Sequence, residues 1–170
     1  MADTHGERAW LHAHAHEPNP QPPAADPAMV VRWDRGAREL AVAPAELRSM
    51  PRTVVSDCYI VSTGHGTSGP FTFGGVRLLD LIHHVIGAHT PWHIADVISA
   101  DGFGTRVTAA ELREGAARPI LMADELDGAP LTRQQGLVRL IVPSEAGDAL
   151  RQVKWIARIE VDPPVNQLIG

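Results

Sequence analysis

The apolar residues of this sequence fall into many short runs that turn residues separate, rather than into long helical stretches. Their length and period predict strands at residues 29–32, 39–42, 53–61, 92–100, 103–107, 119–123, 136–143 and 153–161. Short helices are predicted at residues 43–48 and 76–86 and after Thr108. Because strands and helices do not alternate in a regular βαβ order, the sequence predicts a single α+β domain of short mixed strands with a few short helices.

Residues with special backbone roles mark the ends of these elements. Pro44 lies in the first turn of its helix, where a missing N–H costs nothing, and Gly87 is placed to end the next helix. Thr108 and Glu111 have the spacing of a capping box, which predicts a helix that starts at Thr108. Asp127-Gly128 is typical of a hairpin turn. The last predicted strand, at residues 153–161, is expected to close the sheet.

The N-terminal part differs in composition from the rest of the chain. Residues 1–28 are rich in Pro, Ala and His and contain almost no large apolar side chains, which predicts a flexible tail. Within it His12, His14 and His16 alternate, as in a solvated tail or in an opportunistic site for a divalent metal. Residues 29–170 are enough for one domain with a sizeable core, since 44% of the 170 residues are hydrophobic.

Charge and hydropathy exclude several classes of partner. The formal net charge is −5 and no run of Lys or Arg occurs, so the chain lacks the positive surface that nucleic acids require. The N-terminus has no secretory signal, and no run approaches the ~20 apolar residues of a membrane span. We therefore expect a cytoplasmic protein that binds neither nucleic acid nor membrane.

Cys58 is the only cysteine, so it cannot form an internal disulfide. It lies near the end of the strand at residues 53–61, and residues 62–75, which include five glycines, follow it. We expect this segment to be a flexible loop whose main-chain N–H groups approach an anion such as a phosphate or a pterin. A single cysteine is also compatible with a small buried apolar residue, and both interpretations stay open at this point.

The central histidines give no clear site. His83 and His84 are adjacent, so their side chains point about 100° apart on a helix and do not ligate one metal together. We assign both to a helix surface or the edge of a core. His89 and His93 have no assigned role.

Seven segments occur in one order that is similar to a known family. They are the strand with Cys58 and the segments Gly75–Leu81, Ser99–Phe103, Leu121–Ala123, Leu126–Leu131, Gly136–Pro143 and Val153–Ile159. Together they resemble the molybdopterin-binding domain of the sulfite oxidase family over about residues 29–162. The resemblance implies a mixed α+β fold and a molybdenum–molybdopterin cofactor.

The resemblance also implies roles for particular residues. Cys58 stands at the position of the cysteinate that ligates the metal, and a thiolate is a soft ligand suited to it. Arg139 and Lys154 match the cations expected to neutralise the cofactor's phosphate. Gln134 or Gln135 stands where the family has a histidine, and glutamine donates a hydrogen bond without taking up charge.

Two functions follow. The first is a small oxidoreductase that performs two-electron oxygen-atom transfer on a small substrate, with Tyr59 or His65 near the open metal position and a separate electron-transfer partner. The second is a cofactor-free enzyme or binding protein that uses the same fold. In it Cys58, Tyr59, His65 and Asp57 line a cavity for an organic molecule, and His65 with Asp57 performs acid–base chemistry of a lyase or cyclase type. A sulfur enclosed by hydrocarbon, or cations that face bulk water, would contradict the first function.

Overall fold

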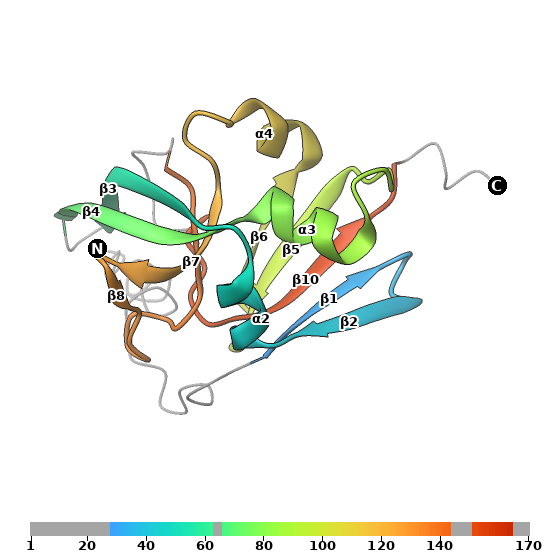
Figure 1. The fold of residues 1–170 in the computed structure, drawn as a ribbon, viewed down its shortest axis with the longest axis horizontal. Helices are drawn as coiled ribbons and strands as arrows, with labels where there is room; N and C mark the ends of the chain where they lie inside the picture. Colours follow the sequence, from blue (N-terminus) through green and yellow to red (C-terminus); the bar gives the residue numbers. More distant parts are fainter. Residues whose placement is uncertain (1–27, 63–65, 144–150, 165–170) are drawn as a thin grey trace, which may run out of the picture.

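Two β-sheets and three short helices make up the part of the chain that the structure describes (Figure 1). This computed structural model describes residues 28–62, 66–143 and 151–164. The helices are α2 (Pro44–Ser49), α3 (Leu78–Ile86) and α4 (Ala109–Glu114). None of these helices is long and apolar enough to cross a membrane. The predicted tail lies outside the described residues except for Ala28, as do His12, His14 and His16.

The first sheet has the strand order β2-β1-β10-β5-β6. Its strands are β1 (Met29–Trp33), β2 (Arg38–Val42), β5 (Ile94–Ser99), β6 (Gly104–Thr108) and β10 (Ile156–Asp162). β1 and β10 are parallel, whereas the other neighbours are antiparallel. β10 therefore lies at the centre of the sheet and not at its end, and its buried Ile156, Ile159 and Val161 explain this position.

The local signals of the sequence are confirmed here. β1 and β2 pair as a hairpin, whose turn contains the positive φ angles of Asp34, Arg35 and Gly36. Thr108 accepts a hydrogen bond from the main-chain N–H of Glu111, and the Glu111 carboxylate accepts one from the main-chain N–H of Thr108, so the capping box forms.

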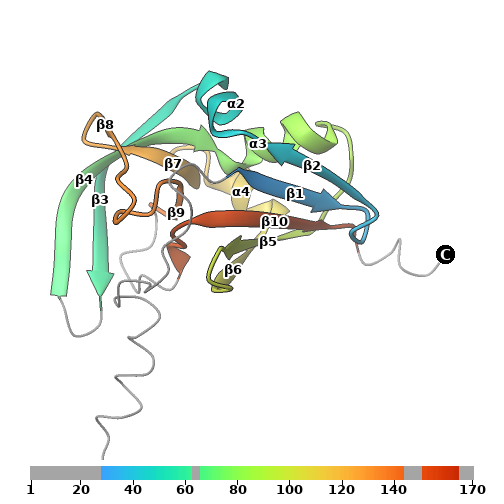
Figure 2. The same ribbon diagram turned by 90° about the horizontal axis from the view of Figure 1, so that it is seen from below.

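The second sheet has the strand order β3-β4-β7-β8, and β9 pairs with β7. Its strands are β3 (Thr53–Ser62), β4 (Gly66–Arg77), β7 (Leu121–Leu126), β8 (Ala129–Pro130) and β9 (Arg139–Ile141). The hairpin of β3 and β4 extends as a long curved ribbon beyond the other strands (Figure 2).

The predicted flexible loop at residues 62–75 is wrong over most of its length, because residues 66–75 form part of strand β4. A Cβ atom on Gly75 would lie only 2.1 Å from the main-chain oxygen of Met122 in β7. The glycine therefore allows two strands to approach closely rather than making the chain flexible. Residues 66–75 pair with β3, and from Phe73 onward β4 pairs with β7 as well, so this segment is a strand of the sheet and not an anion-binding loop.

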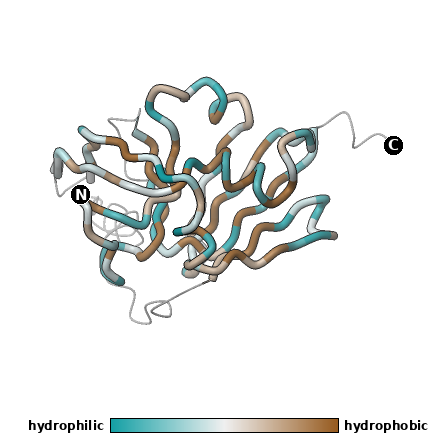
Figure 3. Tube along the Cα trace, viewed as in Figure 1, coloured by the Kyte–Doolittle hydropathy of each residue, from teal (hydrophilic) through white to brown (hydrophobic). Residues whose placement is uncertain are grey.

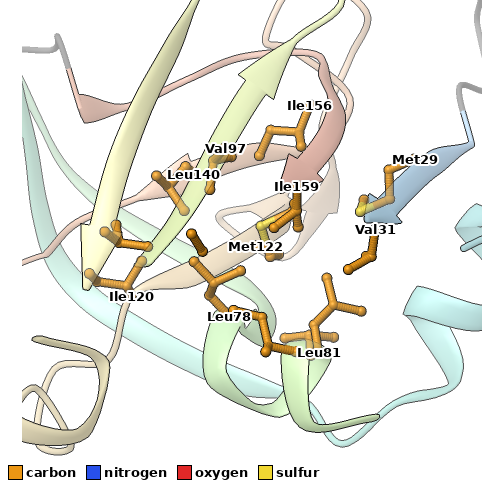
Figure 4. Close-up of a cluster of buried hydrophobic side chains, with 14 of the residues drawn as sticks. Met29, Val31, Leu78, Leu81, Val97, Ile120, Met122, Leu140, Ile156 and Ile159 are labelled. Atoms are coloured by element: carbon orange, nitrogen blue, oxygen red, sulfur yellow. The ribbon is translucent and has the colours of Figure 1, made fainter. Parts of the chain in front are cut away.

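The larger hydrophobic core joins the first sheet, α3 and one face of the second sheet. Figure 4 shows side chains from these three elements converging, among them Val31, Leu81 and Met122. Figure 3 shows the same distribution along the chain, with apolar residues in the central strands and polar residues at the β1–β2 turn. The opposite face of the second sheet carries a smaller cluster, which we call the small cluster: Val55, Cys58, Phe73, Leu121, Ala123, Leu131 and Ile141.

Candidate functional site

Strand pairing places Arg139 on the face of the second sheet that carries the small cluster. Ala123 pairs with Arg139, and Leu121 pairs with Ile141. Directly opposed residues of antiparallel strands project from the same face, as do residues two positions apart. Because Leu121, Ala123 and Ile141 belong to the small cluster, Arg139 and Cys58 lie on one face of the sheet.

The Arg139 side chain is buried and has few polar partners. It is 6% exposed, its Nε atom has no hydrogen-bond partner, and one terminal nitrogen donates a long 3.5 Å hydrogen bond to the main-chain oxygen of Gln135. Its guanidinium carbon lies 5.7 Å from the centre of the Phe73 ring. Burial lowers the pKa of Arg139 to about 10, which leaves the group charged at neutral pH. No carboxylate of the described residues pairs with it.

Lys154 is held beside Arg139 by main-chain pairing. Leu140 N–H donates to Val153 at 2.8 Å, and Trp155 N–H donates to Gly136 at 3.0 Å, so the two segments run side by side. Gly136 has a φ of 110°, and a Cβ atom there would lie 2.8 Å from the Lys154 Cβ. Burial first, and the charge of Arg139 second, lower the pKa of the Lys154 amine. A buried arginine and a half-buried lysine therefore lie side by side.

Cys58 lies at an irregular point of β3. Its side chain is 2% exposed, and the pairing of β3 with β4 shifts between Val55 and Cys58 and again after Cys58. The thiol lies 3.6 Å from the main-chain oxygen of Val55 and 3.7 Å from that of Ser56. Burial raises the pKa of the Cys58 thiol, and the charge of Arg118 partly opposes this. The sulfur is thus packed against apolar side chains but also faces polar atoms.

Arg118 is a site residue that sequence reasoning missed. It follows α4, far from Cys58 in the sequence, and only the folded chain brings the two together. Its guanidinium donates to the main-chain oxygens of Ser56 at 3.0 Å and Asp57 at 3.2 Å and lies 4.0 Å from the Cys58 sulfur. Arg118 and Ser56 also line a groove of about 420 Å³ between β3 and the segment after α4.

The other predicted site residues differ in exposure, and one of them lies outside the described residues. Tyr59 is 45% exposed, and Asp57 is exposed with a φ of 56°. Gln134 is exposed, whereas Gln135 contacts Arg139 through its main-chain oxygen and bonds Thr132 through its side chain. Gln135 is therefore the glutamine that lies beside Arg139. His65 lies outside the described residues.

The central histidines lie mostly on the surface, as expected. His83 and His84 belong to α3, and His84 contacts a carboxylate oxygen of Glu46 at 3.1 Å. His89 and His93 are exposed. Within residues 28–62, 66–143 and 151–164, no three His, Cys, Asp or Glu side chains group in a way that could hold a metal ion.

Comparisons with known proteins identify the family and a similar fold. The sequence matches the family described as the oxidoreductase molybdopterin binding domain over residues 31–167. A search of curated proteins finds no match. Among solved structures, the fold is similar to that of the sulfane dehydrogenase SoxCD from Paracoccus pantotrophus, with a TM-score of 0.63 and 18% sequence identity. The similarity covers 82% of this chain but only 39% of that chain, so this chain spans well under half of that protein's length.

Proposed function

The chain belongs to the family of oxidoreductase molybdopterin-binding domains, and we propose that it holds a molybdenum–molybdopterin cofactor on the face of its second sheet. The membership confirms the resemblance drawn from the ordered motifs, and the two-sheet structure confirms the α+β fold. A small substrate and a separate electron-transfer partner are part of this proposal.

The observation that carries the proposal is a pair of neighbouring cations, the buried Arg139 and the half-buried Lys154. Arg139 and Lys154 lie side by side, and no carboxylate of the described residues pairs with either of them. A buried charge without a counterion is costly, and two adjacent like charges add repulsion. An anionic group placed between them would remove both costs. The phosphate of the pterin cofactor has the charge that this site requires.

The residues around Arg139 and Lys154 fit the phosphate end of the cofactor. The buried Nε of Arg139 lacks an acceptor, and the Lys154 amine lacks an anion. Gln135 fixes the turn that carries Arg139, because its side chain and that of Thr132 exchange hydrogen bonds with each other's main chain. Arg139, Lys154 and Gln135 would hold the phosphate end, and Cys58 would supply the protein ligand to the metal.

When bound, the molybdenum would supply a centre that changes by two electrons during oxygen-atom transfer. The chain's own residues would prepare the ligand end of the site. Arg118 holds the carbonyl oxygens of Ser56 and Asp57, which fixes the bend of β3, and its charge favours the thiolate form of Cys58 that a metal requires. The groove beside Arg118 would give a small substrate access.

The burial of Cys58 sets a requirement for this function. At 2% exposure the sulfur reaches a metal only when the side chains that cover it move. We place this movement in the hairpin of β3 and β4, which extends beyond the other strands of its sheet (Figure 2).

Expression in a host that makes the pterin cofactor tests this function. Molybdenum and pterin should be measured per chain for the wild type and for Cys58→Ser. We expect both components in the wild type, and in the variant a loss of molybdenum and of the visible absorbance of a metal-bound thiolate. Ser56→Ala is the matched control, because it changes a neighbouring side chain and leaves the thiol and the carbonyl oxygens in place. A wild-type protein that carries neither molybdenum nor pterin would contradict the function.

A further inference from the structure

The close placement of the buried Arg139 and the half-buried Lys154 also affects which of their protons are held. Arg139 and Lys154 project from neighbouring segments joined by main-chain hydrogen bonds, and the Arg139 Nε atom is buried without a partner. The energy of two like charges rises as solvent is removed, because the local dielectric screens them less. A site of this kind lowers its energy by releasing one proton.

The chemistry of the two groups decides which one releases it. A guanidinium keeps its proton even when buried, whereas a lysine amine gives up its proton readily in such a place. The groups that face Lys154 support this choice. Arg139 faces it from β9, the ring of Trp155 lies 5.8 Å from its amine, and the turn before β9 presents the main chain of Gly136. That turn carries the uncharged Gln135 and the exposed Arg133, so the described neighbours supply no negative charge.

We propose that Lys154 is neutral in the anion-free protein at a pH where an exposed lysine is charged, and that binding of a tetrahedral dianion between Arg139 and Lys154 brings a proton onto Lys154. The site therefore binds a phosphate-class anion together with a proton. This inference rests on the proposed function in naming the cofactor's phosphate as that anion, but it concerns the protonation of the chain itself.

Protonation and anion binding are then coupled in both directions. An anion that binds only the charged lysine raises the amine's pKa, and a lower pH strengthens anion binding by the same free energy. Above the pKa of Lys154 in the anion-free protein, the affinity falls by roughly tenfold per pH unit, because each binding event must then take up one proton. Below it, the affinity does not change with pH.

The composition of the chain makes the test direct, since Lys154 is its only lysine. The full-length protein labelled with carbon-13 at the lysine ε-carbon gives one lysine resonance, which reports the charge of Lys154. Sulfate is the probe, because it remains a dianion across the pH range, whereas phosphate titrates itself. We expect the resonance to titrate at a lower pH than free lysine and to move to a higher pH when sulfate is added.

Sulfate binding measured by calorimetry in two buffers of different ionisation enthalpy gives the number of protons taken up. We expect uptake approaching one proton per sulfate above the pKa of Lys154 in the anion-free protein. At pH values below the pKa of Arg139, Lys154→Arg should bind sulfate without proton uptake, because an arginine stays charged there, and Lys154→Met should bind it more weakly with no dependence on pH. Arg113→Met, on the exposed surface of α4, is the matched control and should behave as the wild type.

A lysine resonance that titrates as free lysine, and that sulfate leaves unmoved, would overturn the inference. The same pH dependence in Lys154→Arg as in the wild type would overturn it too. These results are separate from a failure of the proposed function. If the protein lacks molybdenum and pterin but takes up a proton when it binds sulfate, the inference holds and the proposed function fails. If the protein carries the cofactor but Lys154 is already charged without an anion, the proposed function holds and the inference fails.

Discussion

The two sheets of this domain treat charged residues in different ways. On the first sheet charged side chains form partly exposed ion pairs, as Asp96 and Arg106 do across β5 and β6 with a nitrogen–oxygen distance of 2.7 Å. The second sheet also pairs charges at its surface, as Arg52 does with Asp124 of β7, but it buries Arg139 on the face of the small cluster with no carboxylate partner among the described residues. The half-buried Lys154 lies beside Arg139. The second sheet therefore differs from the first in burying an unpaired charge.

This difference separates the part of the domain that provides stability from the part that provides a site. The larger core takes side chains from the first sheet, α3 and the near face of the second sheet. The far face of the second sheet has a smaller core beside the buried, unpaired charge of Arg139, an arrangement that lowers stability unless an anion binds. Three substitutions test this difference between the two sheets.

The largest effect is expected in the core of the first sheet. Ile159 is fully buried in β10, the central strand, so Ile159→Ala should lower the free energy of unfolding by about 2–5 kcal/mol through lost burial and a cavity. Denaturant unfolding followed by circular dichroism measures this change. A change below about 1 kcal/mol would show that the Ile159 side chain of β10 is not packed in the core as described.

A smaller effect of opposite sign is expected on the second sheet. Arg139→Met replaces a buried unpaired charge by an apolar side chain of similar length, so it should raise the free energy of unfolding of the anion-free protein by about 1–4 kcal/mol. The same unfolding measurement, in buffer without phosphate or sulfate, checks this. A clear loss of stability would mean that Arg139 serves the fold rather than a ligand, and the contrast between the sheets would disappear.

The smallest effect is expected at a paired surface charge. The pKa of Glu111 is lower in the folded protein than in the unfolded chain, and the largest cause is a hydrogen bond from Arg151. The Glu111 carboxylate therefore stabilises the fold at pH values above its unfolded pKa, and this contribution is lost as the pH falls through its folded pKa. Glu111→Gln should therefore cost about 0.5 kcal/mol at neutral pH, because solvent screens the pair, and nothing in acid. Unfolding curves at neutral and acidic pH measure the difference. Glu114→Gln, on the exposed side of the same helix, is the control, and an equal cost at both pH values would contradict the linkage.

Features set by neighbouring residues could be predicted from the sequence. The capping box at Thr108, the hairpin turn at Asp127-Gly128 and the end of α3 at Gly87 are all as predicted, because each depends on residues a few positions apart.

Features set by distant parts of the chain could not be predicted. Gly75 was expected in a loop, but it serves the close approach of β4 to β7, and glycine is favoured in both roles. The last strand was expected to close the sheet, but the sequence did not indicate that β10 would pair in parallel with β1 from the opposite end of the chain. Arg118 and Cys58 meet only after folding, and no pattern in the sequence marks such a pair.

The pterin content of the protein tests the central claim most directly. Wild-type chain, the double variant Arg139→Ala with Lys154→Ala, and a control double variant Arg48→Ala with Arg113→Ala should be purified from a host that makes the cofactor. Both control residues are exposed on helices, so the control removes the same amount of positive charge. We predict pterin in the wild type and the control and its loss from the Arg139 and Lys154 variant. Equal pterin content in all three proteins would show that Arg139 and Lys154 do not hold the cofactor.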